Sequence, residues 1–249
     1  MNEEVKRLAA AVNAAKEICV FTGAGIRCPS GIPDFRSADG LYNSEGMGRY
    51  TPEEIISHSF FVAHPDLFYE FYKSKMMYPD AKPNDAHLIW AELERAGKRV
   101  SIVTQNIDGL HTDAGSTEIY ELHCSVRRNH CTHCRAFYDG DFVYRADGVP
   151  RCPKCGGLIK PDVVLYEEGL DGDVITGAVN AIGRAELMVV IGTSLAVYPA
   201  ASFLGAFAGS TVALINLSST PYDRRADIVL HEDAAAVARD LREACIFPA

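Results

Sequence analysis

The chain has 249 residues, of which 48% are apolar and 23% are charged, a composition typical of a soluble globular protein. The formal net charge of −9 argues against a general nucleic-acid-binding protein, which usually carries a basic face. No stretch approaches the ~18 uninterrupted apolar residues of a membrane span, and the charged N-terminus is unlike a secretory signal. We therefore expect a cytoplasmic protein that contacts neither nucleic acid nor membrane and keeps its thiols reduced.

The first 25 residues predict a helix, a buried strand and a glycine turn. Asn2 can cap an amphipathic helix at the N-terminus. The apolar face of this helix consists of Val5, Leu8, Ala9 and Val12. Residues 17–25, EICVFTGAG, then form an apolar run that ends in glycines, as where α/β folds bring backbone N–H groups to a phosphate. The third glycine of G-x-G-x-x-G is replaced by Cys28, so an ordinary tight turn explains this piece alone equally well.

Residues 34–80 interrupt the α/β pattern. Residues 34–50 are polar and glycine-rich, which indicates a loop, whereas residues 51–77 are helical in pattern and rich in Phe and Tyr. Thr51 can cap the first helix, with Pro52 at its first position and Glu54 completing a capping box. We expect the aromatic side chains to form the core of this insertion rather than a binding stripe.

The remainder of the chain alternates strands with helices. Apolar, β-branched runs predict strands at 99–106, 185–194, 210–218 and 226–230. Helical patterns cover 84–96, 172–184, 199–208 and 233–244. This alternation predicts an α/β fold, a Rossmann-like parallel sheet with helices on both faces. Ligands of such sheets bind at the carboxyl ends of strands, where this chain gathers small and polar residues.

Four of the eight cysteines predict a metal site. Cys131, Cys134, Cys152 and Cys155 form two C-x-x-C pairs with seventeen residues between them. In a reducing compartment this spacing is typical of a structural zinc ion with four thiolate ligands. His130 and His133 lie beside these cysteines, but four sulfurs already complete the shell, so we expect both imidazoles at the surface. Cys19 lies in an apolar run and is expected in the core.

Several motifs together resemble those of sirtuins, the NAD-dependent protein lysine deacylases. The resemblance covers nearly the whole chain, in the family's order. It rests on GAG with SGIPDFRS (23–37), TQNIDGLH (104–111), ELH (121–123), the two C-x-x-C pairs, KPDVVLYEE (160–168), GTSLAVYPA (192–200) and IN (215–216). It implies a discontinuous Rossmann-like domain from residues 1–33, 81–123 and 161–249. A cofactor loop with a helical insertion would span residues 34–80, and a zinc-binding insertion residues 124–160.

The resemblance also implies the chemistry. Such enzymes take NAD+ as co-substrate and an acyl-lysine protein or peptide, and they release nicotinamide, O-acyl-ADP-ribose and free lysine. His123 matches the family's catalytic base, acting on the ribose hydroxyls, a task that suits the pKa range of imidazole. Asn106 and Asp108 match residues that order the ribose, a water and the nicotinamide amide.

The cofactor and substrate residues follow by position. The residues that match cofactor contacts are Gly23, Ala24, Gly25, Cys28, Asp34, Phe35, Arg36, Gln105, Asn106, Ile107, Asp108, Gly192, Thr193, Ser194, Asn216, Leu217, Asp233 and Ala234. The residues that match the two edges between which a substrate strand is added are Val164, Tyr166, Leu195 and Val197.

Some positions depart from the family pattern. Arg27 stands where the family usually has a Ser, and it would contact a phosphate or face solvent. Cys124 stands where the family has a glycine after the catalytic base. If that backbone needs a positive φ, the Cβ of Cys124 costs about 1 kcal/mol, and its thiol would narrow the acyl channel or make the enzyme oxidation-sensitive. The usual Phe-Gly-Glu is replaced by Tyr166, Glu167 and Glu168.

Acyl preference is also open to prediction. Relatives that remove succinyl or malonyl groups have a Tyr and an Arg three residues apart, whereas here Tyr72 follows Tyr69 at that distance. We therefore expect neutral acyl groups, because a carboxylate would be buried unpaired. Two alternatives stay open: an NAD-dependent protein ADP-ribosyltransferase, and a non-catalytic NAD- and zinc-binding interaction module. We expect a monomer.

Overall fold

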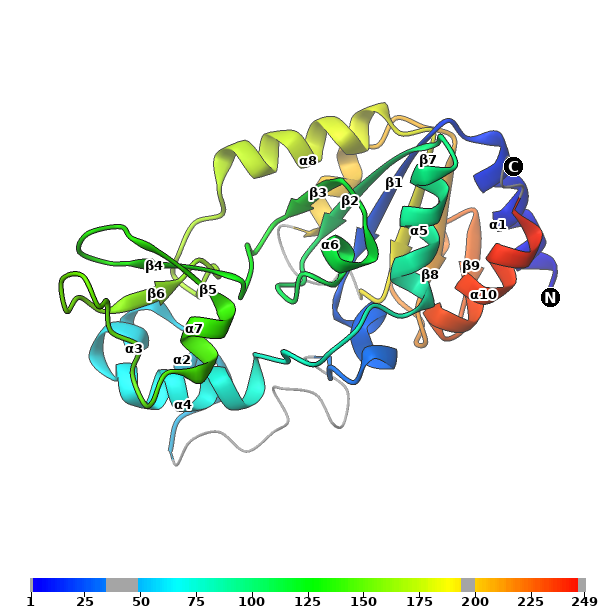
Figure 1. Ribbon diagram of the computed structural model, residues 1–249. Helices are drawn as coiled ribbons and strands as arrows, with labels where there is room; N and C mark the ends of the chain where they lie inside the picture. Colours follow the sequence, from blue (N-terminus) through cyan, green and yellow to red (C-terminus); the bar gives the residue numbers. More distant parts are fainter. Residues whose placement is uncertain (1, 35–48, 194–199, 246–249) are drawn as a thin grey trace.

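The computed structural model describes residues 2–34, 49–193 and 200–245 (Figure 1). Five predicted site residues lie outside the described residues: Phe35, Arg36, Ser194, Leu195 and Val197. Among the described helices, none is long and apolar enough to cross a membrane.

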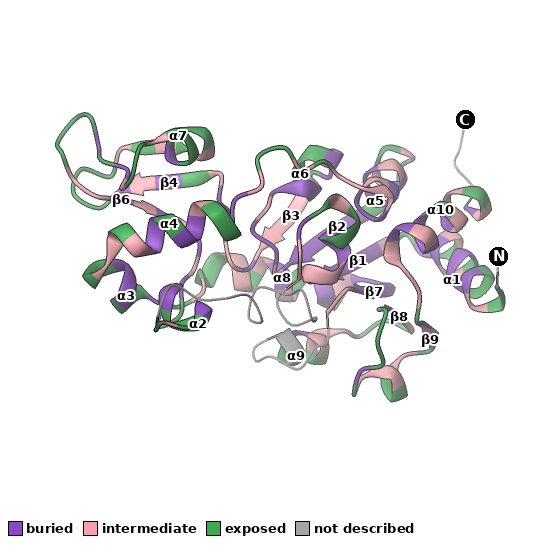
Figure 2. Cartoon of the chain, turned by 90° about the horizontal axis from the view of Figure 1, so that it is seen from below, coloured by how far each residue is buried: buried purple, intermediate pink, exposed green. Residues whose placement is uncertain are grey.

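The larger part of the molecule is built on a six-stranded sheet of order β3-β2-β1-β7-β8-β9, in which every neighbouring pair is parallel. The strands are β1 (Glu17–Thr22), β2 (Arg99–Thr104), β3 (Glu118–Glu121), β7 (Leu187–Ile191), β8 (Thr211–Ile215) and β9 (Ile228–Leu230). The predicted fold class is confirmed. No sequence pattern predicted β3, a four-residue edge strand whose residues are all only half-buried, so it lacks the apolar run that marks the inner strands (Figure 2).

Helices cover both faces of this sheet, because alternate strand side chains point to opposite sides. Ile18 and Val20 of β1 pack in one core with α1 (Glu3–Ala14), α5 (Asp85–Arg95) and α10 (Ala234–Ala244). Cys19 and Phe21 pack in the other with α8 (Gly172–Arg184), α9 (Ala200–Phe203) and the 3-10 turn η3 (Leu204–Ala206). The core position expected for Cys19 is confirmed. Figure 2 shows the central strands buried between these layers.

The N-terminal helix has the predicted design. The Asn2 side chain accepts a hydrogen bond from the Val5 backbone N–H at 2.8 Å and so caps α1. The four residues of the predicted apolar face are all buried. The helix predicted at 199–208, in contrast, is shorter in the structure. The α-helix α9 is followed by the tighter 3-10 turn η3, and the helical segment ends at Ala206.

A smaller module lies at the opposite end of the molecule (Figure 1). It contains an antiparallel sheet of order β5-β4-β6, made of β4 (Arg128–Cys131), β5 (Phe137–Asp139) and β6 (Ile159–Pro161). Its helices are α2 (Pro52–Ile55), α3 (His58–Ala63), α4 (Pro65–Lys75) and α7 (Gly140–Arg145). The predicted capping box at Thr51 is present.

The helical insertion is divided into three pieces because Ser57 caps α3 and Pro65 begins α4. Its aromatic side chains are buried and contact one another edge-to-face or stacked, as the predicted core of the insertion requires. The buried aromatic residues of α3 and α4 are Phe60, Phe61, Phe68, Tyr69, Phe71 and Tyr72.

Candidate active site and metal centre

The carboxyl ends of the parallel strands meet at one edge of the large sheet, and their turns touch. The Gly25 backbone N–H donates to the Gly192 carbonyl at 2.8 Å, which joins the turn after β1 to the turn after β7. The Asn106 side-chain amide, after β2, donates to the Gly23 carbonyl at 3.0 Å. The structure thus brings together three of the predicted cofactor segments, although they are up to 169 residues apart (192 minus 23).

Only glycine fits where these turns meet. A Cβ on Gly25 would lie 2.7 Å from the Gly192 Cα, and one on Gly192 would lie 2.3 Å from the Ile26 backbone nitrogen. Gly192 also has a positive φ of 63°. Ala24, Gly25 and Thr193 lie partly exposed at this junction. The surface at these strand ends therefore consists of backbone without bulky side chains, which allows a phosphate group to approach closely.

His123 follows β3 and faces the turn after β2. Its Nδ1 lies 2.9 Å from the Gln105 carbonyl oxygen, which can only accept, so Nδ1 carries the proton and Nε2 holds the free lone pair. Burial lowers the pKa of His123 below its ordinary value, and the hydrogen bond to Gln105 partly offsets this. The Gln105 amide in turn donates to Thr193 Oγ1 at 3.3 Å. The imidazole is therefore oriented as a neutral base.

Asn106 and Asp108 each present an unsatisfied oxygen at the same edge. Asn106 Oδ1 and Asp108 Oδ2 are both buried without a hydrogen-bond partner among the described residues. The other carboxylate oxygen, Asp108 Oδ1, accepts from the Leu110 backbone N–H at 2.9 Å. A buried oxygen without a donor costs free energy, which a ligand supplying N–H or O–H groups would recover. These two orphaned oxygens fit the amide and hydroxyl groups of a nicotinamide nucleotide.

Arg27, one of the departures from the family pattern, is buried, and its expected phosphate contact stays a prediction. It lies in η1 (Ala24–Ser30) with only 5% of its surface exposed, so the solvent-facing alternative is wrong. Its Nη1 lies 3.7 Å from Asp108 Oδ2, which makes it a neighbour of the predicted amide-binding carboxylate. Cys28, the next residue, is exposed, and its thiol donates weakly to the Ala24 carbonyl at 3.7 Å. Asp34 lies partly exposed at the end of this segment.

A buried polar layer beneath these residues was missed. Thr22 and Thr104, the last residues of β1 and β2, share a 2.8 Å hydrogen bond, and Thr22 Oγ1 lies 3.1 Å from His111 Nε2. The His111 ring, in α6 (Leu110–Ala114), meets His87 of α5 at 4.8 Å between centroids. Burial lowers the pKa of His87 to about 4 and that of His111 far below its ordinary value. The sequence held one signal, a His at the end of TQNIDGLH, but nothing that paired it with residue 87.

The remaining predicted cofactor residues lie beside Asn106 and in two further turns, after β8 and after β9. Ile107 is buried, and its carbonyl accepts from the Val126 backbone N–H at 3.0 Å. The Asn216 side chain, after β8, donates to the Ser218 carbonyl at 2.7 Å. Leu217 beside it is 69% exposed. Asp233 caps α10 by accepting from the Ala236 N–H at 2.9 Å, and Ala234 begins that helix partly exposed.

Several backbone groups of the predicted substrate edge at 164–166 are already hydrogen-bonded within the chain. The Val164 backbone N–H donates to the His123 carbonyl at 3.2 Å. The Tyr166 backbone N–H donates to the Ile56 carbonyl at 3.1 Å, and its carbonyl accepts from the His58 N–H at 3.0 Å. An added strand therefore has to use the remaining backbone groups of this edge. A hollow of about 690 Å³ lies beside Tyr166, walled by α2 and α3.

The departures at 167 and 124 both have positive φ. Glu167 has a φ of 74°, and its carboxylate accepts from the Ser59 backbone N–H and hydroxyl, each at 2.9 Å. These bonds at the start of α3 offset the strain of a non-glycine residue in the left-handed region. Cys124 has a φ of 57°, so its backbone lies in the left-handed region that favours glycine. Burial raises the pKa of its thiol, which disfavours the reactive thiolate.

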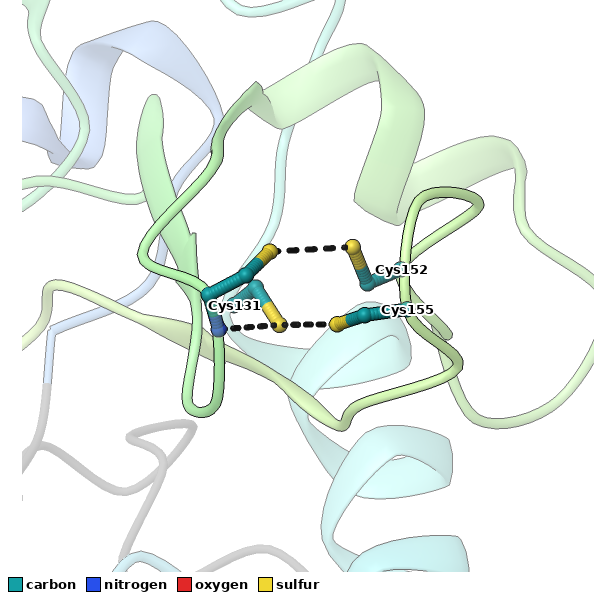
Figure 3. A group of neighbouring side chains, drawn as sticks. Cys131, Cys152 and Cys155 are labelled. Carbon is teal, nitrogen blue, oxygen red and sulfur yellow. Dashed lines mark hydrogen bonds between the residues drawn. The ribbon is translucent and has the colours of Figure 1, made fainter.

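The four cysteines of the two C-x-x-C pairs form one cluster in the smaller module (Figure 3). Their sulfur atoms all lie within 4.8 Å of one another, with Sγ–Sγ distances of 3.5 Å for Cys131–Cys155 and 3.6 Å for Cys134–Cys152. Sulfurs 2.3 Å from a tetrahedral zinc would be about 3.8 Å apart. A Cβ on Gly157 would lie 2.8 Å from Cys131 Sγ, so this glycine preserves room for the sulfurs. The cluster fits one closed, structural zinc site.

His123 is not a member of this cluster. Among the described residues, the group that could hold a metal contains only the four cysteines. His133 is exposed, as expected. His130 is only half-buried, and its Nδ1 pairs with Asp162 Oδ1 at 2.6 Å.

The fold and the two centres define a Rossmann-type α/β protein that also carries a four-cysteine module fit for a metal ion. The chain belongs to the Sir2 family, whose model matches residues 23–199. The NAD-dependent protein deacetylase of Clostridium perfringens (strain 13 / Type A) is 50% identical over 238 residues, which cover 95% of this chain and 98% of that protein.

Two solved structures resemble the chain throughout. Sir2 in complex with a p53 peptide and NAD+ has a TM-score of 0.84 and 36% identity, with 98% of each chain covered. Sir2Tm bound to a propionylated peptide has a TM-score of 0.82 and 36% identity, with 96% of this chain and 97% of that chain covered.

Proposed function

We propose that the protein is an NAD-dependent protein lysine deacetylase. The observation that carries the proposal is the arrangement at the strand ends: a neutral imidazole, His123, beside two orphaned oxygens, Asn106 Oδ1 and Asp108 Oδ2. A relative with 50% identity is an NAD-dependent protein deacetylase, and a related Sir2 structure holds a peptide together with NAD+.

The cofactor would lie along the carboxyl edge of the large sheet. The glycine turns after β1 and β7 would face the pyrophosphate, and Asn216 with Asp233 would flank the adenosine half. Asn106, Ile107 and Asp108 would hold the nicotinamide half, because their turn ends the strand beside β1. When bound, NAD+ supplies a ribose whose bond to nicotinamide breaks and which then receives the acyl group from lysine.

The chain's own residues would supply orientation and proton transfer. Gln105 fixes the tautomer of His123, so that Nε2 can accept a proton from a ribose hydroxyl. Asn106 is held by the Gly23 carbonyl through its amide nitrogen, which leaves its oxygen to accept from a hydroxyl or water. The zinc-binding cluster would take no part in the reaction, because a closed set of four sulfurs leaves no open position.

Neutral acyl groups remain our proposed preference. Tyr69 and Tyr72 are buried in the helical insertion, and the Tyr69 hydroxyl donates to the Ile159 carbonyl. A related Sir2 structure holds a propionylated peptide. Lys75 follows Tyr72 at the same three-residue spacing and is the cation that a succinyl carboxylate would need, but it is exposed at the end of α4.

An acyl-peptide panel tests both proposals. We expect NAD-dependent release of free lysine and nicotinamide from acetyl and propionyl peptides, with a slower rate on succinyl peptide. A succinyl rate above the acetyl rate would overturn the acyl preference, and loss of that rate in Lys75→Ala would assign the carboxylate contact to Lys75.

The His123→Ala variant is the decisive comparison for the activity. We expect its rate to fall by roughly 10²–10⁴-fold, the usual contribution of a general base. His133→Ala, which changes an exposed imidazole, serves as the matched control and should retain the wild-type rate. A target that gains the mass of ADP-ribose instead of losing its acyl group would indicate a transferase. Absence of any release that requires both substrates would indicate a non-catalytic module.

Two further expectations stay predictions. Sedimentation of the purified protein would test the expected monomer, and fractionation of cells would test the cytoplasmic location.

A further inference from the structure

Arg27 places a buried cation beside the carboxylate that is proposed to bind the nicotinamide amide. The side chains of Arg27 and Asp108 are 7% and 9% exposed, and Arg27 Nη1 lies 3.7 Å from Asp108 Oδ2. Arg27 Nη2 donates to the Pro33 carbonyl at 3.2 Å, which fixes the guanidinium at the end of η1. Breaking such a buried pair by removing one partner leaves the other charge uncompensated.

The two oxygens of Asp108 have different tasks. Oδ1 accepts from the Leu110 backbone N–H and so fixes the carboxylate plane at the start of α6. Oδ2 faces the guanidinium at 3.7 Å, which is too long for a hydrogen bond, and it accepts none from the described residues. It therefore has a charge partner and keeps its lone pairs for a ligand.

A second arginine near Asp108 does not duplicate this contact. Arg127 Nε donates to the Asp108 backbone carbonyl at 3.3 Å, while its guanidinium is bound by Asp113. It therefore acts on the backbone of residue 108 and not on its carboxylate.

We propose that Arg27 is a positioning residue that orients the Asp108 carboxylate so that Oδ2 accepts the N–H of a pyridine carboxamide. The proposal rests on the proposed function, which places nicotinamide at this turn. It makes Arg27 a determinant of how strongly the site prefers a carboxamide over a ketone of the same shape.

The test compares two probes that differ only in the donor. Nicotinamide has a carboxamide NH₂, whereas 3-acetylpyridine has a methyl group in its place. Each is titrated calorimetrically into the full-length protein in the presence of ADP-ribose, so that the readout is binding and not turnover. We expect the wild type to prefer nicotinamide by roughly tenfold or more, the effect of one hydrogen bond to a charged acceptor.

Arg27→Met removes the charge and keeps most of the length, whereas Arg27→Lys keeps the charge. We expect the preference to fall to within about threefold in Arg27→Met and to recover largely in Arg27→Lys, whose ammonium can still pair with a carboxylate. Asp108→Asn should abolish the preference, and adding Arg27→Met to it should change nothing further, since the two residues act as one unit.

Some outcomes would overturn the proposal. If Arg27→Met weakens both probes by the same factor, or leaves the preference intact, Arg27 only supports the local fold. If Arg27→Met does not fold, folded Arg27→Lys decides the question. Loss of the preference for nicotinamide in this variant, which keeps the positive charge, would also overturn the proposal. A wild type that binds both probes equally overturns the proposal and the amide-binding task of Asp108. The deacetylase proposal fails separately, when wild-type protein releases no lysine from an acetyl peptide.

Discussion

The candidate active-site edge and the four-cysteine cluster are both polar centres, but their polar atoms differ in whether they have partners. At the sheet edge, Asn106 Oδ1 and Asp108 Oδ2 are buried without hydrogen-bond partners among the described residues. In the cluster, four sulfurs converge within 4.8 Å and would be fully used by one ion. A ligand-binding site thus leaves buried polar atoms unsatisfied until its ligand arrives, whereas a structural metal site uses all of its donor atoms on one ion.

The largest effect, a loss of folding of the smaller module, is expected from removing one cysteine of the four-cysteine cluster. Cys152→Ser removes a buried ligand of the cluster, and structural zinc contributes directly to folding. We expect loss of bound zinc, loss of amide protection in β4, β5 and β6, and loss of peptide-dependent activity. Metal analysis with hydrogen exchange checks this, with His133→Ala as the control. A variant that keeps both metal and activity would show that the cluster is not structural.

The buried histidines under the active-site edge should make the fold acid-sensitive. His87 has a folded pKa of about 4 against an ordinary value of 6.5, and burial also holds the pKa of His111 well below that ordinary value. Below pH 6.5 the unfolded chain therefore binds protons that the folded chain refuses, so the free energy of unfolding falls as pH falls. The loss through His87 alone approaches about 3 kcal/mol near pH 4.

Urea unfolding between pH 7 and pH 5 measures this loss above the range in which most carboxylates titrate. His87→Gln should show a flatter dependence of unfolding free energy on pH, whatever its absolute stability. A slope equal to that of the wild type would contradict the buried neutral imidazole.

A smaller effect concerns the pH dependence of catalysis. The proposed base is the neutral form of His123, and burial lowers the pKa of this imidazole. The neutral form therefore persists to lower pH, and the acid limb of kcat/KM for the wild type should lie below pH 6.5. Peptide binding measured over the same range serves as the control. A limb at or above pH 6.5 would indicate that another group controls the rate.

The smallest effect is expected at Cys124, the strained neighbour of the base. Cys124→Gly removes a Cβ at a φ of 57° and should raise the unfolding free energy by up to about 1 kcal/mol, or a few degrees in Tm. Cys124→Ala keeps the Cβ and loses the thiol, so it should gain no stability.

Rates, acyl preference and peroxide tolerance of the two variants separate strain from thiol chemistry. Because burial raises the Cys124 pKa, we expect little change in peroxide tolerance. If Cys124→Gly matches the wild type in stability, rate, acyl preference and peroxide tolerance, residue 124 has no special task.

Much of this fold could be predicted from local sequence patterns. The capping by Asn2, the capping box at Thr51, the buried strands and the two C-x-x-C pairs were readable because each depends on neighbours within a few residues. The edge strand β3 and the breaks in the helical insertion were not, because a short half-buried strand exists only through its pairing with β2.

Period and spacing were enough to predict the fold class, the four metal ligands and the strand ends that carry polar residues. Three contacts could not be predicted: Arg27 faces Asp108, His87 meets His111, and the backbone of Tyr166 is already bonded to residues 56 and 58. These contacts join segments far apart in the chain, or depend on the side-chain direction that packing imposes. No local periodicity encodes either of these.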